Sequence, residues 1–247
     1  MPRFRRIEDD DYDWAPYVSV SERRLKAKIE TAKLGRETSP IVVQGSQIAK
    51  TFWGRSWCTN LERYSDYRNR LPRGRTYVRS GCVIDLNIET GRVTALVSGS
   101  RLYRVEVKVS PIPSQRWKAV CQDCSGAVDS LVELLEGRFT KATMERLCEE
   151  GTGMFPLPGE IRFTCSCPDS ARMCKHVAAV LYGIGSRLDE TPELLFVLRK
   201  VDQRELITKA ARQAHEPQSS RVLKSGNLSE IFGIEIVERP RKKASRR

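Results

Sequence analysis

The sequence lacks the residues and motifs on which most enzyme active sites depend. It has only two histidines among its 247 residues, His176 and His215. It contains no Gly-x-x-x-x-Gly-Lys phosphate loop, no dinucleotide-binding glycine fingerprint and no His-Glu-x-x-His motif. Because His176 belongs to a cysteine-rich motif, Ser/His/Asp or Cys/His catalysis would have to use His215, which lies at the end of a predicted helix. We therefore predict that the protein is not an enzyme.

Long apolar runs are also missing. No stretch approaches the ~20 apolar residues needed to span a bilayer. The N-terminus, M-P-R-F-R-R-I-E-D-D-D, has no apolar segment of the kind that a secretory signal needs. These absences predict a cytoplasmic protein, where disulfides are rare. Five of its eight cysteines lie outside the zinc motif described below and are expected to stay reduced: Cys58, Cys82, Cys121, Cys124 and Cys148.

Negative charge is under-represented relative to positive charge. Lysine and arginine number 43 against 31 aspartate and glutamate residues, so the net charge is +12 and the isoelectric point is near 9.5. Such an excess raises encounter rates with polyanions without specifying a sequence. It could also serve only to keep the protein in solution. The excess is unevenly distributed, which favours a nucleic-acid partner, with DNA preferred.

A quartet of metal-binding residues is the most distinctive feature of the chain: Cys165, Cys167, Cys174 and His176. Three thiolates and one imidazole satisfy tetrahedral zinc. A closed four-ligand site leaves no position for water or substrate, so the expected zinc is structural rather than catalytic. The alternative is a set of buried cysteines beside an incidental histidine. Four ligands within twelve residues favour the zinc site.

Local patterns place these ligands between a strand and a helix. Residues 161–164 alternate like a half-buried strand, and residues 177–182 predict a helix that ends at Gly183 or Gly185. The N-terminus of that helix, with Arg172 and Lys175 nearby, adds positive potential. This potential lowers the pKa of the cysteines and favours the metal-bound form.

The spacing Cys-x-Cys, a gap and Cys-x-His resembles the SWIM zinc finger, with Cys165 and Cys167 as the first pair and Cys174 and His176 as the second. The resemblance implies a compact zinc-stabilised module with DNA-binding or protein-interaction roles. The flanking sequences K-T-F-W-G-R-S-W and R-L-P-R-G-R-T-Y-V are similar to bacterial SWIM proteins that accompany Snf-type helicases. This wider likeness covers most of residues 48–201 and implies a Snf-type helicase as a partner.

The patterns along the chain predict an α+β fold: a small antiparallel β-meander plus helices, with an embedded SWIM-type zinc finger and disordered basic termini. The expected divisions are a flexible charged arm with a transient helix (1–40), an α+β region (41–160) with a meander at about 76–110 and helices at about 114–150, the zinc finger (161–190), a helical extension (191–215), and a linker, small apolar segment and basic tail (216–247).

Two groups of residues in the α+β region have competing interpretations. The aromatic residues Phe52, Trp53, Trp57 and Tyr64 fall at helix-compatible spacings and are expected to pack in the core rather than stack on bases. The pair Cys121-x-x-Cys124 could indicate redox chemistry or a second zinc site. Because no other Cys or His pair is near to complete a site, packing on the apolar face of a helix is preferred.

Arginines are concentrated between residues 68 and 79, around a predicted turn at Pro72-Arg73-Gly74-Arg75. They could form a plain solvated loop, but arginine binds phosphate bidentately and stacks on bases. The candidate nucleic-acid-binding residues are these arginines and two cations of the zinc motif: Arg68, Arg70, Arg73, Arg75, Arg79, Arg172 and Lys175.

The sequence therefore predicts a zinc-binding, SWIM-type, non-enzymatic adaptor that binds nucleic acid. The second hypothesis is an interaction module for a Snf-type helicase ATPase. In this reading, the apolar segment at residues 228–237 docks on a partner. A third hypothesis is a thiol-redox protein that uses Cys121 and Cys124.

Overall fold

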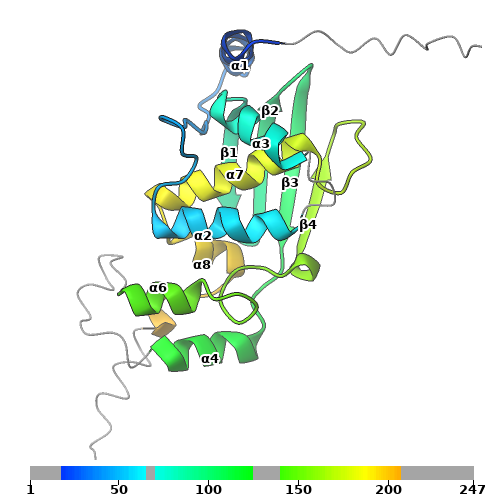
Figure 1. The fold of residues 1–247 in the computed structure, drawn as a ribbon. Coiled ribbons are helices and arrows are strands. Elements are labelled where there is room, and N and C mark those ends of the chain that lie inside the picture. Colours follow the sequence, from blue (N-terminus) through cyan, green and yellow to red (C-terminus); the bar gives the residue numbers. More distant parts are fainter. Residues whose placement is uncertain (1–17, 65–69, 125–139, 207–247) are drawn as a thin grey trace, which may run out of the picture. The chain divides into compact units, whose positions relative to one another are not determined.

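A four-stranded antiparallel sheet in the order β1-β2-β3-β4 forms the centre of the fold (Figure 1). The computed structural model describes residues 18–64, 70–124 and 140–206. The strands β1 (Val83–Glu89), β2 (Arg92–Ser98) and β3 (Leu102–Val109) are the predicted meander. The fourth strand, β4 (Ile161–Cys165), pairs with β3 and carries the chain into the cysteine motif. Helices together with an antiparallel sheet confirm the predicted α+β class.

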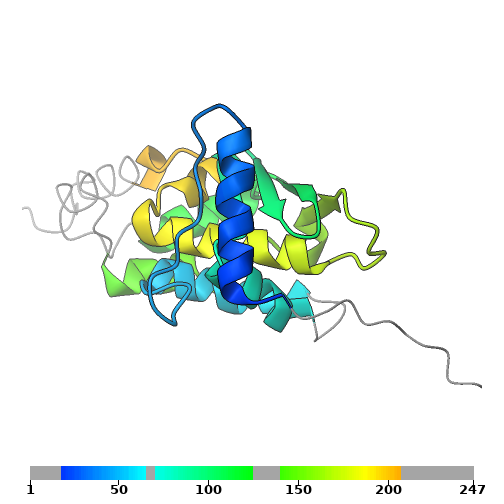
Figure 2. The same cartoon turned by 90° about the horizontal axis from the view of Figure 1, so that it is seen from above.

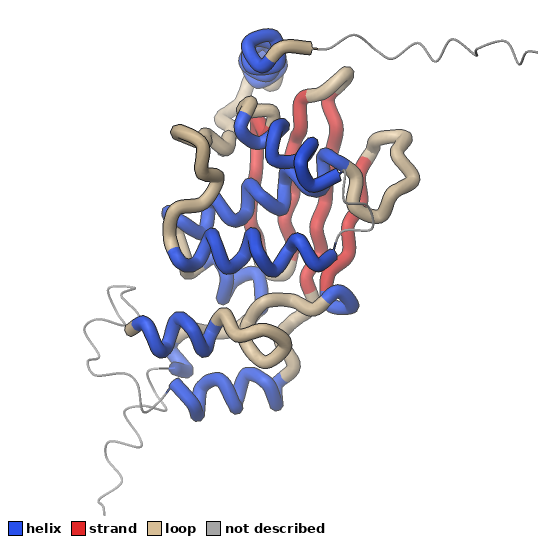
Figure 3. Tube along the Cα trace, in the orientation of Figure 1, coloured by secondary structure: helices blue, strands red, loops and turns tan. Residues whose placement is uncertain are grey.

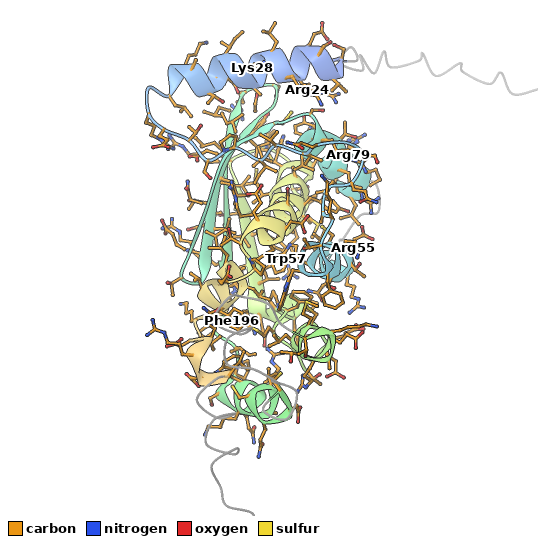
Figure 4. All side chains as sticks on the ribbon, turned by 90° about the vertical axis from the view of Figure 1, so that its left-hand side faces the viewer. Arg24, Lys28, Arg55, Trp57, Arg79 and Phe196 are labelled. Atoms are coloured by element: carbon orange, nitrogen blue, oxygen red, sulfur yellow. The ribbon has the colours of Figure 1, made fainter. Side chains whose placement is uncertain are left out.

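Strand alternation determines which face of the sheet is covered. In β2 and β3 the residues Val93, Ala95, Val97, Val105 and Val107 are buried, and Thr94, Leu96 and Glu106, which alternate with them, are partly exposed. Viewed along the sheet, α2, α3 and α7 lie on one side of the strands (Figure 4). The sheet is therefore half-buried, as the alternating sequence predicts.

Helix α7 (Lys175–Glu190) lies across the sheet, and α2 (Phe52–Leu61) and α3 (Arg70–Arg79) pack beside it (Figures 1 and 3). Trp53 and Trp57 of α2 are buried, which confirms their predicted place in the core, whereas Phe52 is half-buried. The indole N–H of Trp57 donates a hydrogen bond to the Leu181 carbonyl at 2.8 Å. This bond satisfies the one polar group of a fully buried ring and joins α2 to α7.

The predicted end of α7 at Gly183 or Gly185 is wrong, because the helix continues to Glu190. These glycines permit close packing instead of ending the helix. A Cβ atom on Gly185 would lie 2.7 Å from the Cys58 Sγ, and one on Gly54 of α2 would lie 2.4 Å from the Gly185 carbonyl oxygen. The two helices therefore approach each other at a pair of glycines.

The predicted turn at Pro72-Arg73-Gly74-Arg75 is also wrong, since these residues lie inside α3. Pro72 is in the first turn of the helix, where a backbone N–H has no partner within the helix. A Cβ atom on Gly74 would lie 2.5 Å from the Cβ of Ala178, so glycine allows α3 to contact α7 closely. Packing against α7 outweighs the low helix propensity of proline and glycine.

Helix α1 (Val20–Lys33) lies within the predicted N-terminal arm, where a transient helix is expected. Ser19 Oγ accepts a hydrogen bond from the Glu22 N–H at 3.2 Å, and Glu22 accepts one from the Ser19 N–H at 2.8 Å. This reciprocal capping box starts the helix. Its Ala27 is buried, and α1 crosses above the sheet and α7 when the fold is viewed from above (Figure 2).

Three further helices pack at one end of the sheet: α4 (Ser114–Cys124), α6 (Lys141–Leu147) and α8 (Leu194–Arg199). Arg199 is fully buried, and its Nη2 lies 2.8 Å from Glu160 Oε2, while Arg116 of α4 pairs with the same carboxylate. A buried arginine is tolerated because it is paired and hydrogen-bonded. Glu160 is the last residue of the short 3₁₀ turn Pro158–Glu160, directly before β4.

Several expectations lie outside the described residues. These are residues 125–139 of the predicted helical stretch at about 114–150, the helix expected to end at His215, the 216–247 segment and residues 1–17 of the N-terminal arm. In the described part of the chain, no helix has the length and apolar character needed to cross a membrane.

Candidate metal centre

The four predicted ligands come together where β4 ends and α7 begins. Cys165 is the last residue of β4, Cys174 is the N-cap of α7, and His176 lies in the first turn of α7. The three sulfur atoms and one histidine nitrogen all lie within 4.8 Å of one another. The Nδ1 atom of His176 is 3.8 Å from the Cys165 Sγ and 3.9 Å from the Cys174 Sγ.

These distances fit a zinc ion. A tetrahedral site with Zn–S bonds of about 2.3 Å and a Zn–N bond of about 2.0 Å has ligand–ligand edges of about 3.5–3.8 Å. The donor set of three thiolates and one imidazole is that of a structural zinc site, and all four positions are filled by protein. Zinc is therefore the cofactor that the cluster fits, and Nδ1 is the histidine atom that would bind it.

The surroundings of Cys174 favour a thiolate there. Hydrogen bonding with Cys165 lowers the pKa of Cys174, and hydrogen bonds from His176 and the Val177 N–H lower it further. The Val177 N–H donates to the Cys174 Sγ at 3.5 Å, so the positive end of α7 also faces this sulfur. The same hydrogen bond with Cys174, together with burial, raises the pKa of Cys165. A bound cation would take the place of the protons that the cluster otherwise shares.

Two tyrosine rings orient the His176 imidazole. Tyr103 of β3 stacks on it with ring centroids 4.1 Å apart and an angle of 24° between the planes. Tyr77 of α3 contacts it edge-on, with centroids 5.4 Å apart. The Nε2 atom is buried without a hydrogen-bond partner among the described residues. Stacking therefore does the orienting that a hydrogen bond from the second ring nitrogen does in many zinc sites.

The loop between the two cysteine pairs is anchored by hydrogen bonds. Asp169 Oδ1 accepts from the Ala171 N–H and from Arg70 of α3, both at 3.1 Å. Arg172 donates to the carbonyls of Pro158 at 2.9 Å and Ile161 at 3.3 Å. These bonds fold the loop back towards α3 and the start of β4, which holds the two ligand pairs close to each other.

Comparison with known proteins agrees with this geometry. Residues 163–183 match the SWIM zinc finger. The SWIM-type segment thus starts within β4, contains all four ligands and ends inside α7. It accounts for the zinc site and leaves the rest of the chain outside the match.

A longer likeness links the chain to a protein of Mycobacterium tuberculosis (strain ATCC 25618 / H37Rv) named "Uncharacterized protein Rv2102". The two are 34% identical over 167 residues, which is 66% of this chain and 60% of the relative. The chain therefore spans less than two thirds of that relative's length. No solved structure matches the chain.

The predicted nucleic-acid-binding residues differ in their surroundings. Arg73 and Arg79 are exposed on α3, whereas Arg70 and Arg75 pair with carboxylates, Asp169 and Glu62. Arg172 holds the zinc loop, as described above. Lys175 reaches towards α3, where its Nζ lies 5.3 Å from the centroid of the Tyr77 ring. Arg68 lies outside the described residues. The structure brings Lys175 to α3 and gives Arg70 and Arg172 partners within the zinc module.

Sequence reasoning missed the two tyrosines beside His176. The alternation of β3 indicates that Tyr103 faces the helices, but it carries no information about which helical residue it meets. Tyr77 is separated from the motif by about a hundred residues, so only the packing of α3 on α7 brings it to the site.

Cys121 and Cys124 behave as core residues. Both are buried on α4, as the sequence predicts. Burial raises the pKa of the Cys124 thiol to about 11, which disfavours the thiolate needed for redox exchange. Within the described residues, the group of potential ligands that could hold a metal ion is the SWIM-type quartet.

Proposed function

We propose that the protein is a zinc-stabilised, non-enzymatic adaptor that binds nucleic acid in the cytoplasm, with DNA as the favoured form. The observation that carries this proposal is a closed four-ligand site in a chain of net charge +12. A closed site leaves the zinc no open position for water or substrate, so its role is to hold the module together. The cationic excess then supplies attraction to a polyanion.

Helix α3 offers one surface for such contacts. Arg73 and Arg79 project from it without a carboxylate partner among the described residues, and the basic tail at residues 239–247 adds further charge. Contacts to phosphates position a protein without reading the base sequence. Binding through these groups should therefore be salt-dependent and insensitive to sequence.

Fluorescence anisotropy with labelled duplex and single-stranded DNA, across several salt concentrations, tests the proposal. Each phosphate contact contributes about −0.9 to the slope of log K against log salt on duplex DNA and about −0.7 on single strands. Arg73→Gln with Arg79→Gln, and separately removal of residues 239–247, should each make the slope shallower while zinc content is unchanged. Absence of wild-type binding at low salt would contradict the proposal.

A second candidate function is an interaction module for a Snf-type helicase ATPase. The observation that favours it is the outer face of α1, where the side chains of Leu25 and Ile29 are 61% and 47% exposed. Exposed apolar side chains in a row suit a protein partner better than a phosphate backbone. Co-purification of an ATPase that survives high salt and nuclease, and that is lost on Leu25→Ser with Ile29→Ser, would support this candidate.

The thiol-redox hypothesis has less support, because both cysteines of α4 are buried and the pKa of Cys124 is raised. A reversible disulfide between Cys121 and Cys124, detected by mass spectrometry after mild oxidation of the folded protein, would revive it.

A further inference from the structure

The second face of the sheet carries an uncovered row of cations. Helices α2, α3 and α7 lie on the other side of the sheet, as the edge-on view shows (Figure 4), whereas Arg92, Lys108 and Arg162 are exposed. On the uncovered side, Arg92 of β2 is directly opposite Lys108 of β3, and Lys108 is directly opposite Arg162 of β4. Neighbouring strands are about 4.8 Å apart, so three cations follow one line over roughly 10 Å.

Such a row opposes folding of the sheet. Like charges directly opposite each other on neighbouring strands are destabilising. Glu106 offsets part of the repulsion: its carboxylate lies 2.5 Å from Arg92 Nε and 3.4 Å from Lys108 Nζ. Glu89 is opposite Arg92 on β1. Arg162 has no ion pair with a described residue, so the row keeps an excess of positive charge.

Lys200 adds a fourth cation at the end of the row. It is the C-cap of α8 and adopts a left-handed backbone conformation, with φ 58° and ψ 46°. Among the described residues, it is the one non-glycine residue with positive φ. Helices commonly end in this conformation with glycine, because a Cβ atom is disfavoured there. The sequence has lysine at this position instead.

The left-handed turn directs the Lys200 side chain onto the β1–β2 turn. A Cβ atom on Gly91 would lie 2.1 Å from the Lys200 Cε and 3.0 Å from its Nζ. Lys200, Arg92, Lys108 and Arg162 together line an open pocket of about 400 Å³ at this end of the sheet. We call these four residues the sheet-face patch.

We propose that the sheet-face patch binds the phosphodiester backbone of nucleic acid without reading the bases. This inference rests on the proposed function and adds a surface that is separate from the arginines of α3. Two guanidinium groups and two ammonium groups around one pocket suit phosphate oxygens, which arginine can bind bidentately. A backbone conformation that is unfavourable for lysine, and a like-charge row that opposes folding, are both explained by an anionic ligand.

The chemistry of this face also limits the mode of binding. Sheets that recognise single-stranded RNA present aromatic side chains on which bases stack. The outward-facing residues of the four strands include no aromatic side chain, since Tyr103 and Phe163 point towards the helices. Base stacking is therefore absent here, and contact through phosphates remains.

The test is a charge-removal variant, Arg92→Gln with Lys108→Gln and Arg162→Gln, measured by anisotropy against two duplexes of unrelated sequence. With three phosphate contacts removed, the salt slope should become shallower by about 2–3, and affinity at low salt should fall about tenfold or more, equally for both duplexes. The matched control, Lys28→Gln with Arg55→Gln and Lys118→Gln, removes the same charge from exposed positions on three helices and should retain wild-type affinity within about twofold.

A second variant separates binding from folding. Lys200→Gly removes a cation and supplies the residue that the left-handed C-cap prefers, so the midpoint of thermal unfolding should rise while affinity for DNA falls. Charge-preserving changes, Arg92→Lys and Arg162→Lys, should keep most of the slope. If the patch were purely structural, Lys200→Gly would lower the midpoint of thermal unfolding and leave the affinity for DNA unchanged. Arg92→Lys and Arg162→Lys would then not keep the salt slope through their charge.

Three results would overturn the inference. If the triple variant binds DNA as tightly as wild type, the sheet-face patch is not a binding surface. The proposed function would still hold, with α3 or the tail as the contact surface. A strong preference for one duplex that the patch variants abolish would contradict binding without base readout. No wild-type binding at any salt concentration would reject the proposed function and the inference together.

Discussion

His176 is held in the zinc site by packing rather than by a hydrogen bond to its second ring nitrogen. Its Nδ1 faces two sulfur atoms, its ring stacks on Tyr103, and its Nε2 has no hydrogen-bond partner in the described part of the chain. Groups that orient a metal ligand typically change metal affinity by 10–100-fold when they are removed.

Replacing the stacked ring should therefore weaken zinc binding. Tyr103→Leu removes the aromatic face, and we expect zinc affinity to fall about tenfold in competition with a chromophoric chelator. Tyr103→Phe is the matched control, because it keeps the ring and loses only the 2.6 Å hydrogen bond between the hydroxyl and Ser100 Oγ. Equal affinities for the two variants would show that stacking does not orient His176.

Cys174 combines three roles: ligand, helix N-cap and preferred thiolate. Cys174→Ser can still cap the helix but binds zinc poorly, so metal content should fall to near zero. Structural zinc contributes on the order of 10–16 kcal/mol at neutral pH in small fingers, so stability should fall with it. Elemental analysis of the purified protein measures the first effect and thermal unfolding the second.

The control for this variant is the pair Cys121→Ala and Cys124→Ala. These cysteines are buried on α4, so their loss should leave one zinc per chain and cause a modest loss of stability. A Cys174→Ser protein that keeps its zinc, or a double variant that loses a second zinc, would show that the ligands are wrongly assigned.

Contacts between elements depend on glycines as much as on apolar side chains. At the α2–α7 crossing, an added Cβ atom on Gly54 would lie 2.2 Å from Asp189 Oδ1 and 2.4 Å from the Gly185 carbonyl oxygen. Asp189 cannot move freely, because it accepts hydrogen bonds from the Thr51 N–H at 3.1 Å and from Thr51 Oγ1 at 2.6 Å at the start of α2.

Gly54→Ala should therefore lower the free energy of unfolding. Overpacking typically costs about 1–3 kcal/mol, which exceeds the gain of up to about 1 kcal/mol from replacing a helical glycine by alanine. Urea denaturation of the zinc-loaded protein measures the change. Gly159→Ala is the control, because nothing lies within 4 Å of its added Cβ atom; a loss of similar size there would argue against the crossing as the cause.

We expect a second junction between elements, at Glu160, to be sensitive to acid. Burial raises the pKa of Glu160, but the Arg116 and Leu157 hydrogen bonds and the charge of Arg199 outweigh it, so the pKa is lowered from its ordinary value of 4.5. A lowered pKa contributes stability above the unfolded-state value, and this stability is lost as the pH falls through the folded-state value.

The variant Glu160→Gln, which lacks the carboxylate, should thus be less stable than wild type at neutral pH. The difference in free energy of unfolding should shrink as the pH falls below about 4.5, where the unfolded carboxyl takes up its proton. Denaturation curves between neutral pH and the acid range would show this. A difference that stays constant with pH would exclude the ion pairs with Arg116 and Arg199 as its source.

At the scale of the whole folded unit, zinc is coupled to the core through α7. This helix carries Cys174 at its N-cap and His176 in its first turn, and it also packs on α2, α3 and the sheet. A metal that stabilises the start of α7 therefore stabilises the element that the other layers contact.

Removing zinc with a strong chelator should consequently lower the unfolding temperature of one cooperative transition rather than melt a separate finger. Differential scanning calorimetry with and without chelator measures this, and re-addition of zinc should restore the original transition. Two transitions, one of which is unaffected by the chelator, would show that the SWIM-type segment unfolds independently of the α+β core.

The features that sequence reasoning predicted are those with a local physical cause. Alternating valines predict β2 and β3, and a Cys-x-Cys and Cys-x-His pattern predicts the zinc ligands from chemistry and spacing. The helical extent of residues 70–79 and 183–190 was predicted wrongly, because proline and glycine were interpreted as breaks. At Gly74 and Gly185 a neighbouring helix packs so closely that no Cβ atom fits, and that neighbour is distant in the sequence.

The amino-acid sequence by itself determined the metal, its four ligands, the meander and the positive charge, because these follow from side-chain chemistry and from patterns only a few residues long. Only the tertiary structure decided which tyrosines pack on His176, at which glycines the helices approach each other closely, and which cations share one face of the sheet. Arg92, Lys108 and Arg162 become neighbours through strand register, and register depends on the pairing of strands as much as fifty residues apart along the chain. Such pairings are selected by the burial of the whole core, so no local stretch of sequence contains them.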